Sequence, residues 1–370
     1  MTAILLRYKR FWAVLLAPVS WLLTALCHQW PAGAERWFSQ GLYPLLASGW
    51  GRVFGLLPFS AAQFLILLLP GLAIWYIIHM LLRIRRSPAT RRGDIARLVS
   101  SVFCATGIVW FLFAMLCGLN YARESFAVSG GLNVHNSSAA ELEVLCAELV
   151  ARVNESAALV ARDGQDRMIS SAASDYALAN EAREAYAAVA AEYPVLGGFT
   201  PRPKPVLYSR FMSRIDIVGI YIPFTMEANV NVDICDYEIP AAMCHELAHF
   251  KGFMREDEAN FIAYLACEAS GKPDFAYSGG ILALIHASNQ LRTVSGDAYD
   301  RVMRGLADPV REDFRANSLY WKQFEGPVAE VSSRVNDVYL KTNRQTDGIK
   351  SYGRMVDLLL ADYRKRHGEG

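Results

Sequence analysis

The chain has 370 residues, 53% of them hydrophobic, and its mean hydropathy of +0.17 is high for a soluble protein of this length. The net charge of +1 decides nothing about nucleic acid, but the second half has no Lys/Arg-rich patch with interleaved aromatic residues, so we expect no nucleic-acid partner. None of the seven cysteines forms a C-x-x-C pair, which argues against a cysteine zinc knuckle and leaves disulfides open. The apolar residues are concentrated before residue 120, which predicts a membrane part followed by a globular part.

Three apolar runs approach the length of about 20 residues that a helix needs to cross a bilayer. We expect the first to be retained rather than cleaved as a signal peptide, because no convincing small-x-small site follows it and two more runs come after it. Charge-free runs of this length are rare in soluble cores, which argues against buried core helices. Residues 1–123 are therefore predicted to form a membrane anchor with helices at about 11–27, 62–82 and 98–119.

The distribution of Lys and Arg predicts the orientation of these spans. Three cationic residues precede the first span and six arginines occupy the stretch 83–97, whereas the connection 28–61 carries only Arg36 and Arg52. The positive-inside rule places the N-terminus and the arginine-rich loop in the cytoplasm. We therefore expect a multi-pass protein of the inner (plasma) membrane, in contact with the lipid bilayer, whose residues 124–370 lie outside the cytoplasm. The stretch 36–60 is typical of an amphipathic segment on the outer surface.

The globular part reads as helices, a small sheet, and helices again, which predicts the α+β class. Ser138 and Glu141 have the spacing of a capping box that opens a helix over 139–162, and a second helix is expected over 174–193. Three short β-branched runs predict strands at 204–209, 215–223 and 227–235. Six further helices are expected at 240–251, 256–270, 279–293, 309–323, 328–341 and 350–365.

The stretch "HELAH" at 245–249 has the residue types and spacing of a metal-binding motif. His245 and His249 are one helical turn apart, so both imidazoles leave the same face and fit two ligands of one tetrahedral Zn2+. Glu246 beside them is placed to reach a metal-bound water as a general base. The alternative is a charged helix pair without a metal. The apolar flanks argue against it, because buried histidines and a glutamate are costly to leave unpaired.

A catalytic zinc of this kind needs a third protein ligand. Arg255 occupies the position where one metalloprotease pattern has a third histidine, so that class is excluded. The carboxylates of residues 256–258 remain. We favour Glu256, which shares a helical face with small residues, over Glu258, whose face is core-like. Asn260, one turn after Glu256, is predicted to hydrogen-bond a ligand histidine from outside the metal shell.

An oxyanion-stabilising donor is also expected in such a site. The candidates are Tyr352, which we favour as a catalytic residue, and Tyr221 and Arg255; a tyrosine is more often a core residue. The strand-like "NVNVD" before the motif helix is expected to be the edge strand that holds a substrate backbone. Three polar residues of this region either line the cleft or face solvent, namely Glu227, Asn229 and Asn231.

The pattern "HELAH…EDEANFIAYLA" resembles the gluzincin signature of the zinc peptidases that cleave phage-type repressors and of the prenyl-protein endopeptidases. The resemblance implies Glu256 as the third zinc ligand and Asn260 as its neighbour, although the gap between the motifs is shorter here. The whole chain is similar to an uncharacterised family of bacterial membrane proteins with a domain of unknown function, through "LPFS" at 57–60, "GIYIPFTMEANVN" at 219–231 and "YLKTNRQTDGIKSY" at 339–352. This similarity implies a zincin-like, metallopeptidase-like domain at 124–370 and names no substrate.

The function expected from these residues is a membrane-anchored zinc endopeptidase acting on peptides or envelope proteins. An intramembrane protease is discounted, because five charged residues follow the motif within ten positions. A non-catalytic zinc-binding receptor or scaffold that retains the peptidase fold is the alternative. The sequence determines neither the substrate nor the oligomeric state.

Overall fold

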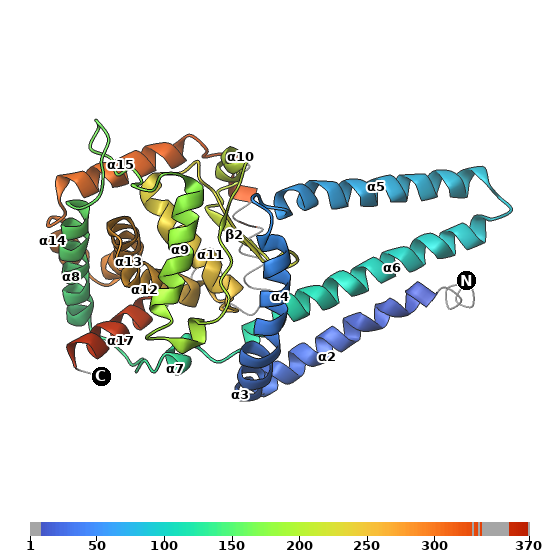
Figure 1. The fold of residues 1–370 in the computed structure, drawn as a ribbon, viewed down its shortest axis with the longest axis horizontal. Coiled ribbons are helices and arrows are strands. Elements are labelled where there is room, and N and C mark those ends of the chain that lie inside the picture. The colour runs from blue at the N-terminus through green and yellow to red at the C-terminus, as the bar shows by residue number, and fades with distance from the viewer. Residues whose placement is uncertain (1–8, 328, 332–333, 335–354, 369–370) are drawn as a thin grey trace.

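Three long apolar helices project from one side of a helical body in the computed structural model (Figure 1). The structure describes residues 9–327, 329–331, 334 and 355–368. We call the three helices the anchor, the stretch 31–60 the connecting segment, and the described residues from 124 onward the body.

The structure confirms three long apolar helices where the spans are expected. Each helix is long and apolar enough to cross a membrane, and the third begins earlier than expected, at Arg91, because the arginine-rich stretch continues it. A Cβ at Gly107 would overlap the carbonyl oxygen of Ala13, so a glycine there lets the first and third helices approach closely. The helices are η1 (Lys9–Leu15) with α2 (Leu16–Gln29), α5 (Ala62–Arg86) and α6 (Arg91–Leu116).

The connecting segment is helical and packs on the body. Phe38, Tyr43 and Ala47 are buried in one cluster with Phe250 and Met254 of the body. The opposite face exposes large apolar side chains, as expected for the amphipathic stretch, namely Trp37, Leu45, Trp50, Val53 and Leu56. The elements are α3 (Pro31–Gly33), η2 (Ala34–Leu42) and α4 (Tyr43–Gly55).

A buried ion pair fastens this segment to the rest of the chain. Arg123, just after the anchor, donates to both carboxylate oxygens of Glu35, at 2.6 and 3.0 Å. The same guanidinium donates to the carbonyl oxygen of Lys251 at 3.1 Å and lies 3.7 Å from the centre of the Phe253 ring. Because Arg123 and Glu35 are both only 4% exposed, each needs the other to compensate its charge.

Helices make up most of the body. The expected capping box opens α8, where Ser138 Oγ accepts from the Glu141 N–H and Glu141 accepts from the Ser138 N–H. A short helix over 296–303 was not expected from the sequence, and the predicted helix 328–341 lies largely outside the described residues. The helices are α7 (Phe126–Ser129), α8 (Ala139–Ala157), α9 (Asp175–Val189), α10 (Ser209–Arg214), α11 (Ile239–Phe250), α12 (Glu256–Ala269), α13 (Pro273–Val294), α14 (Gly296–Met303), α15 (Asp308–Lys322) and α17 (Met355–His367), with short turns at η3 (Gly118–Ala122), η4 (Pro194–Leu196) and η5 (Asp236–Glu238).

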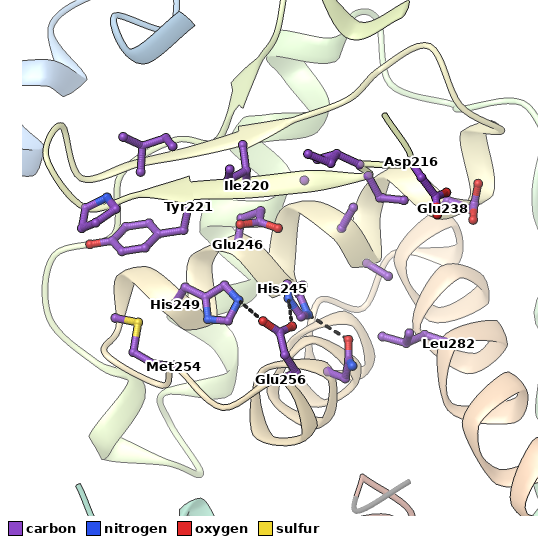
Figure 2. A pocket seen from close by; sticks show the side chains of 18 of the residues that line it. Asp216, Ile220, Tyr221, Glu238, His245, Glu246, His249, Met254, Glu256 and Leu282 are labelled. Atoms are coloured by element: carbon purple, nitrogen blue, oxygen red, sulfur yellow. Dashed lines mark hydrogen bonds and ion pairs between the residues drawn. The ribbon is translucent and has the colours of Figure 1, made fainter. Parts of the chain in front are cut away.

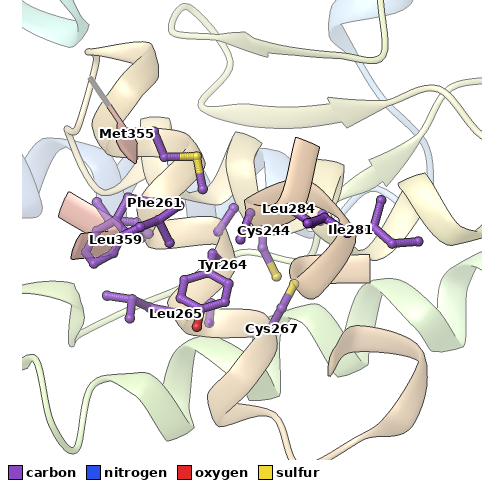
Figure 3. Close-up of a cluster of buried hydrophobic side chains, with 14 of the residues drawn as sticks. Cys244, Phe261, Tyr264, Leu265, Cys267, Ile281, Leu284, Met355 and Leu359 are labelled. Carbon is purple, nitrogen blue, oxygen red and sulfur yellow. The ribbon is translucent and has the colours of Figure 1, made fainter. Parts of the chain in front are cut away.

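The centre of the body is the packing of α12 against both α11 and α13. Figure 3 shows Cys244 and Cys267 pointing toward one another within this apolar cluster. A Cβ at Gly279 would lie 2.5 Å from the Cβ of Cys267, so this glycine allows α13 to approach α12. All seven cysteines are free thiols in this structure.

A three-stranded sheet lies between the body helices and the connecting segment (Figure 1). Its order is β1-β3-β2, with β1 parallel and β2 antiparallel to β3. All three strands are shorter than expected. The third ends at Val230, because the amides of Val232 and Asp233 donate to Ser209 Oγ and Asn231 Oδ1 instead of to a neighbouring strand. The small sheet in a mostly helical chain agrees with the α+β expectation. The strands are β1 (Lys204–Pro205), β2 (Gly219–Ile222) and β3 (Glu227–Val230).

The buried ion pair gives a stability prediction. Glu35→Gln keeps the shape of the side chain but leaves the buried Arg123 guanidinium without its counter-charge. We expect the free energy of unfolding to fall by about 3–5 kcal/mol, measured by chemical denaturation of the detergent-purified protein. Glu312→Gln, which breaks the solvent-exposed pair with Arg315, is the matched control and should leave the unfolding midpoint unchanged. If the free energy of unfolding changed equally in the two variants, the buried pair of Arg123 and Glu35 would not have the stabilising role assigned to it.

Candidate metal centre

The end of α11 brings the candidate site together. Gly252 adopts φ +87°, and the N–H groups of Gly252 and Phe253 donate back to the carbonyls of His249 and Ala248, which is a Schellman ending. The chain then reverses, so that α12 starts at Glu256 and packs along α11. Gly252 therefore ends the motif helix and also folds the second motif onto the first.

The two histidines and Glu256 converge as the spacing predicts. The imidazole rings of His245 and His249 are 4.7 Å apart between centroids. The Glu256 carboxylate lies between them, with Oε2 3.2 Å from His245 Nε2 and Oε1 3.7 Å from His249 Nε2 (Figure 2). One ligand atom from each of the three lies within 4.8 Å of the others.

The outer nitrogen of each imidazole is held by an oxygen. His245 Nδ1 donates to Asn260 Oδ1 at 2.8 Å, and His249 Nδ1 donates to the Phe253 carbonyl at 2.8 Å. These bonds turn both Nε2 atoms toward Glu256, the orientation that second partners give to metal-binding histidines. The structure places Asn260 where the sequence predicted it. The Phe253 carbonyl was missed, since any residue supplies a carbonyl, and the turn at Gly252 was its only sequence signal.

Glu246 is buried between α11 and β2 (Figure 2). A Cβ at Gly219 would overlap its carboxylate, so the absence of a side chain there makes room for Glu246. The backbone N–H of Tyr221 hydrogen-bonds Glu246, yet its Oε2 has no hydrogen-bond partner among the described residues. A buried carboxylate oxygen without a partner is costly and needs an explanation.

Burial and mutual charge set the protonation of the site. Burial raises the pKa of Glu246 to about 8, against the opposing effect of His245. Burial lowers the pKa of His249 to about 4. Burial also disfavours the charged form of His245, but the hydrogen bond and charge of Glu256 outweigh it and raise the pKa to about 9. Glu256 therefore favours positive charge beside its carboxylate, as a carboxylate in the donor set of a metal does.

Glu258, the alternative third ligand, points elsewhere. Its Oε1 accepts from the backbone N–H of Phe126 at 2.8 Å and from Arg255 at 2.7 Å. Arg255 is thereby engaged in an ion pair. The Tyr221 side chain borders the cavity, with its ring 6.4 Å from that of His249. Tyr352, predicted as catalytic, lies outside the described residues.

The expected role of the strand before the motif helix is wrong. That strand, β3, is the central strand of the sheet, and β2 is the edge beside the motif helix. Glu227 is buried and accepts from the N–H groups of Ala61 and Ala62 at the start of α5. Asn229 and Asn231 are buried and donate to neighbouring groups of the sheet region, so none of the three lines the cleft or faces solvent. Alternation marks a strand, but strand order depends on distant partners.

A cavity of about 820 Å³ contains the cluster. Its walls are β2, α11, the side of α13 that carries Leu282, and the end of α6 at Phe113. Asp216 and Glu238 line it as well, and burial raises the pKa of Glu238 to about 7. Neither acid belongs to a spaced motif, so nothing in the sequence marked them as part of the site.

These observations define a mostly helical chain with three membrane-type helices and a partly buried two-histidine, one-glutamate cluster in a cleft beside an edge strand. A family model described as "Protein of unknown function (DUF3810)" matches residues 38–360. The chain therefore belongs to this family, which confirms the expected likeness to a family of unknown function. No curated protein and no solved structure matches the chain.

The placement of Glu258 predicts a structural role. Glu258→Ala removes the acceptor of the buried Phe126 N–H and the partner of Arg255. We expect the free energy of unfolding to fall by about 1–3 kcal/mol, measured by urea denaturation. Glu330→Ala, at a side chain that is 68% exposed, should change nothing. Unchanged stability in Glu258→Ala would show that this carboxylate is not the anchor for residue 126.

Proposed function

We propose that this protein is a membrane-anchored zinc-dependent endopeptidase that hydrolyses peptide bonds outside the cytoplasm. The observation that carries the proposal is the arrangement of the cluster. Two Nε2 atoms and a carboxylate converge in one cleft, and a fourth group, Glu246, lies beside them with an unpartnered buried oxygen. The edge of β2 borders the same cleft.

The donor set suits zinc. His245 and His249 would bind through Nε2 and Glu256 through a carboxylate oxygen, and two nitrogens with one oxygen are typical of a catalytic zinc that keeps a position open. A zinc ion bound there would supply a Lewis acid that lowers the pKa of a bound water to about 7. Asn260 and the Phe253 carbonyl keep the imidazoles oriented for this task.

Glu246 has the position of the general base. Gly219 and the Tyr221 N–H fix its carboxyl group on the β2 side, with Oε2 unpartnered among the described residues. Its pKa of about 8 favours the protonated form without a metal. A zinc cation bound at the histidines would favour the carboxylate, which could then take a proton from the attacking water. The same carboxyl group would then return the proton to the leaving amine. An oxyanion donor is not assigned among the described residues.

The proposed location follows from the distribution of Lys and Arg around the three spans. The arginine-rich loop between α5 and α6 favours the cytoplasm, which places the body on the far side of the inner (plasma) membrane. The tether raises the local concentration of the body at that surface and limits the substrates that it meets.

A non-catalytic zinc-binding receptor or scaffold is the second candidate. Structural zinc sites are usually closed by four protein ligands, whereas three groups converge here among the described residues. Glu246 also lies beside the cluster, where a purely structural site would need no general base. Both features favour the peptidase.

Metal content tests the site first. We expect about one zinc per chain in the purified full-length protein, measured by elemental mass spectrometry after dialysis against zinc and then buffer. His249→Ala and Glu256→Ala should lose the metal because each removes a ligand, whereas Glu258→Ala should keep it because Glu258 faces Phe126. A folded wild-type protein without zinc would refute the proposed metal site.

Glu246→Gln separates the two candidate functions. The amide keeps the size of the side chain but cannot take a proton, so zinc should be retained while cleavage of a mixed-sequence peptide library falls by about 10²–10⁴-fold. Cleavage products are counted by mass spectrometry. Equal zinc content with no cleavage by either protein would favour the receptor, and full activity in the variant would show that Glu246 is not the base.

A further inference from the structure

We propose that Cys244 and Cys267 form a disulfide bond that joins α11 to α12 when the body folds outside the cytoplasm. The proposal rests on the proposed location of the body and is independent of the peptidase activity. Three features support it: the way the two thiols face each other, the residues that the bond would enclose, and the compartment in which the body is expected to fold.

The two thiols face one another across the packed surfaces of α11 and α12. Figure 3 shows their sulfur atoms pointing toward each other, and the Cys267 thiol is in hydrogen-bond contact with that of Cys244. Both side chains are fully buried in the same apolar cluster. The structure shows the reduced form, with both cysteines as free thiols. The fold therefore brings together two sulfur atoms that are 23 residues apart in the sequence.

Two further helices hold the cysteines in this arrangement. Tyr186 of α9 donates from Oη to the carbonyl oxygen of Cys244 at 2.7 Å. Gly279 of α13 has no side chain, and a Cβ there would lie 2.5 Å from Cβ and 3.4 Å from Sγ of Cys267. The α13 backbone can therefore pack directly against Cys267, while α9 fixes the backbone of Cys244.

The bond would close a helical hairpin that carries the whole candidate metal centre. The segment 244–267 contains His245, His249 and Glu256, together with Asn260, which orients His245. Closing a loop of this length reduces the conformational freedom of the unfolded chain and so favours the folded hairpin. The pairing of the two helices would then depend less on a bound metal ion.

A pair of free thiols is the alternative, because buried cysteines also pack as small apolar side chains. The three membrane-type helices and the distribution of Lys and Arg favour a body outside the cytoplasm. Disulfides form and persist in that environment, whereas thiols stay reduced in the cytoplasm. Two cysteines that face each other in an oxidising compartment favour the disulfide.

Oxidation has to occur while the chain folds, because neither side chain is exposed in the folded body. The oxidant is a protein of the same compartment that carries a reactive disulfide. The sulfur of one cysteine attacks this disulfide and forms a mixed disulfide, and the sulfur of the other cysteine then displaces the oxidant. The two cysteines give two electrons and two protons to the oxidant, whose disulfide becomes two thiols.

The test uses the full-length protein, expressed in a bacterial host with an oxidising periplasm. Alkaline phosphatase, which is active only after export, is fused after Gly370 to report the side of the membrane. Cells are quenched with acid, free thiols are blocked with N-ethylmaleimide in denaturant, and mass spectrometry of proteolytic peptides identifies the alkylated and the joined cysteines. Cys146, which is equally buried but lies on α8, is the internal control. A host strain without the periplasmic oxidant is the second control.

We expect peptides joined through Cys244 and Cys267, with Cys146 alkylated, and a smaller joined fraction in the strain without the oxidant. Active phosphatase together with alkylated Cys244 and Cys267 would overturn the disulfide and leave the proposed location intact. Inactive phosphatase would overturn the proposed location, and the disulfide with it. The zinc content and the peptide cleavage described above are measured separately, so a failure of the disulfide is distinguishable from a failure of the proposed function.

A stability measurement gives an independent readout. With dithiothreitol present, the unfolded wild-type protein loses its cross-link, so the urea concentration at the midpoint of unfolding should fall. Cys267→Ala has no cross-link to lose, and dithiothreitol should leave its midpoint unchanged. Cys146→Ala is the matched control and should respond to dithiothreitol as the wild type does. A wild-type midpoint that dithiothreitol leaves unchanged would contradict a disulfide that closes the hairpin.

Discussion

The reversal of the chain at Gly252 is the constraint on which the site and its attachment to the membrane part both depend. Gly252 has φ +87°, and a side chain there would meet Tyr43, Arg123 and Asn120 at 3.1–3.2 Å. A residue other than glycine would therefore be strained in its backbone and crowded by its neighbours. The turn needs glycine for two independent reasons.

The carbonyls around this glycine connect separate parts of the molecule. The Phe250 carbonyl accepts from Tyr43 Oη, and the Lys251 carbonyl accepts from Arg123. The Phe253 carbonyl accepts from His249 Nδ1. The first two contacts hold the connecting segment and the end of the anchor, and the third orients a candidate metal ligand. The geometry of the proposed centre is therefore coupled directly to the membrane part, which accounts for a cleft that starts at α6.

The cleft surrounds a partly buried polar cluster with apolar walls, and this burial has two consequences for the polar groups. Burial keeps water from competing for the histidines and Glu256, which strengthens their mutual interaction. It also leaves Glu246 Oε2 unpartnered, a cost that the surrounding packing has to offset. The close fit of Gly219 against Glu246 shows how narrowly the sheet and the motif helix are matched. Such local conflicts with stability are expected at functional sites.

The sequence by itself determined the features that rest on periodicity and local chemistry. Apolar length marked the three membrane-type helices, the Ser138–Glu141 spacing marked the start of α8, and the four-residue spacing placed both histidines on one helix face. Only the tertiary structure decided which strand forms the edge, how the connecting segment packs, and which carboxylate faces the histidines. Glu256 and Glu258 are chemically equivalent and two residues apart, and they are separated by a contact with Phe126, 132 residues away in the chain. A local pattern reports which side of one element is apolar, whereas the partner of a side chain depends on how distant elements meet.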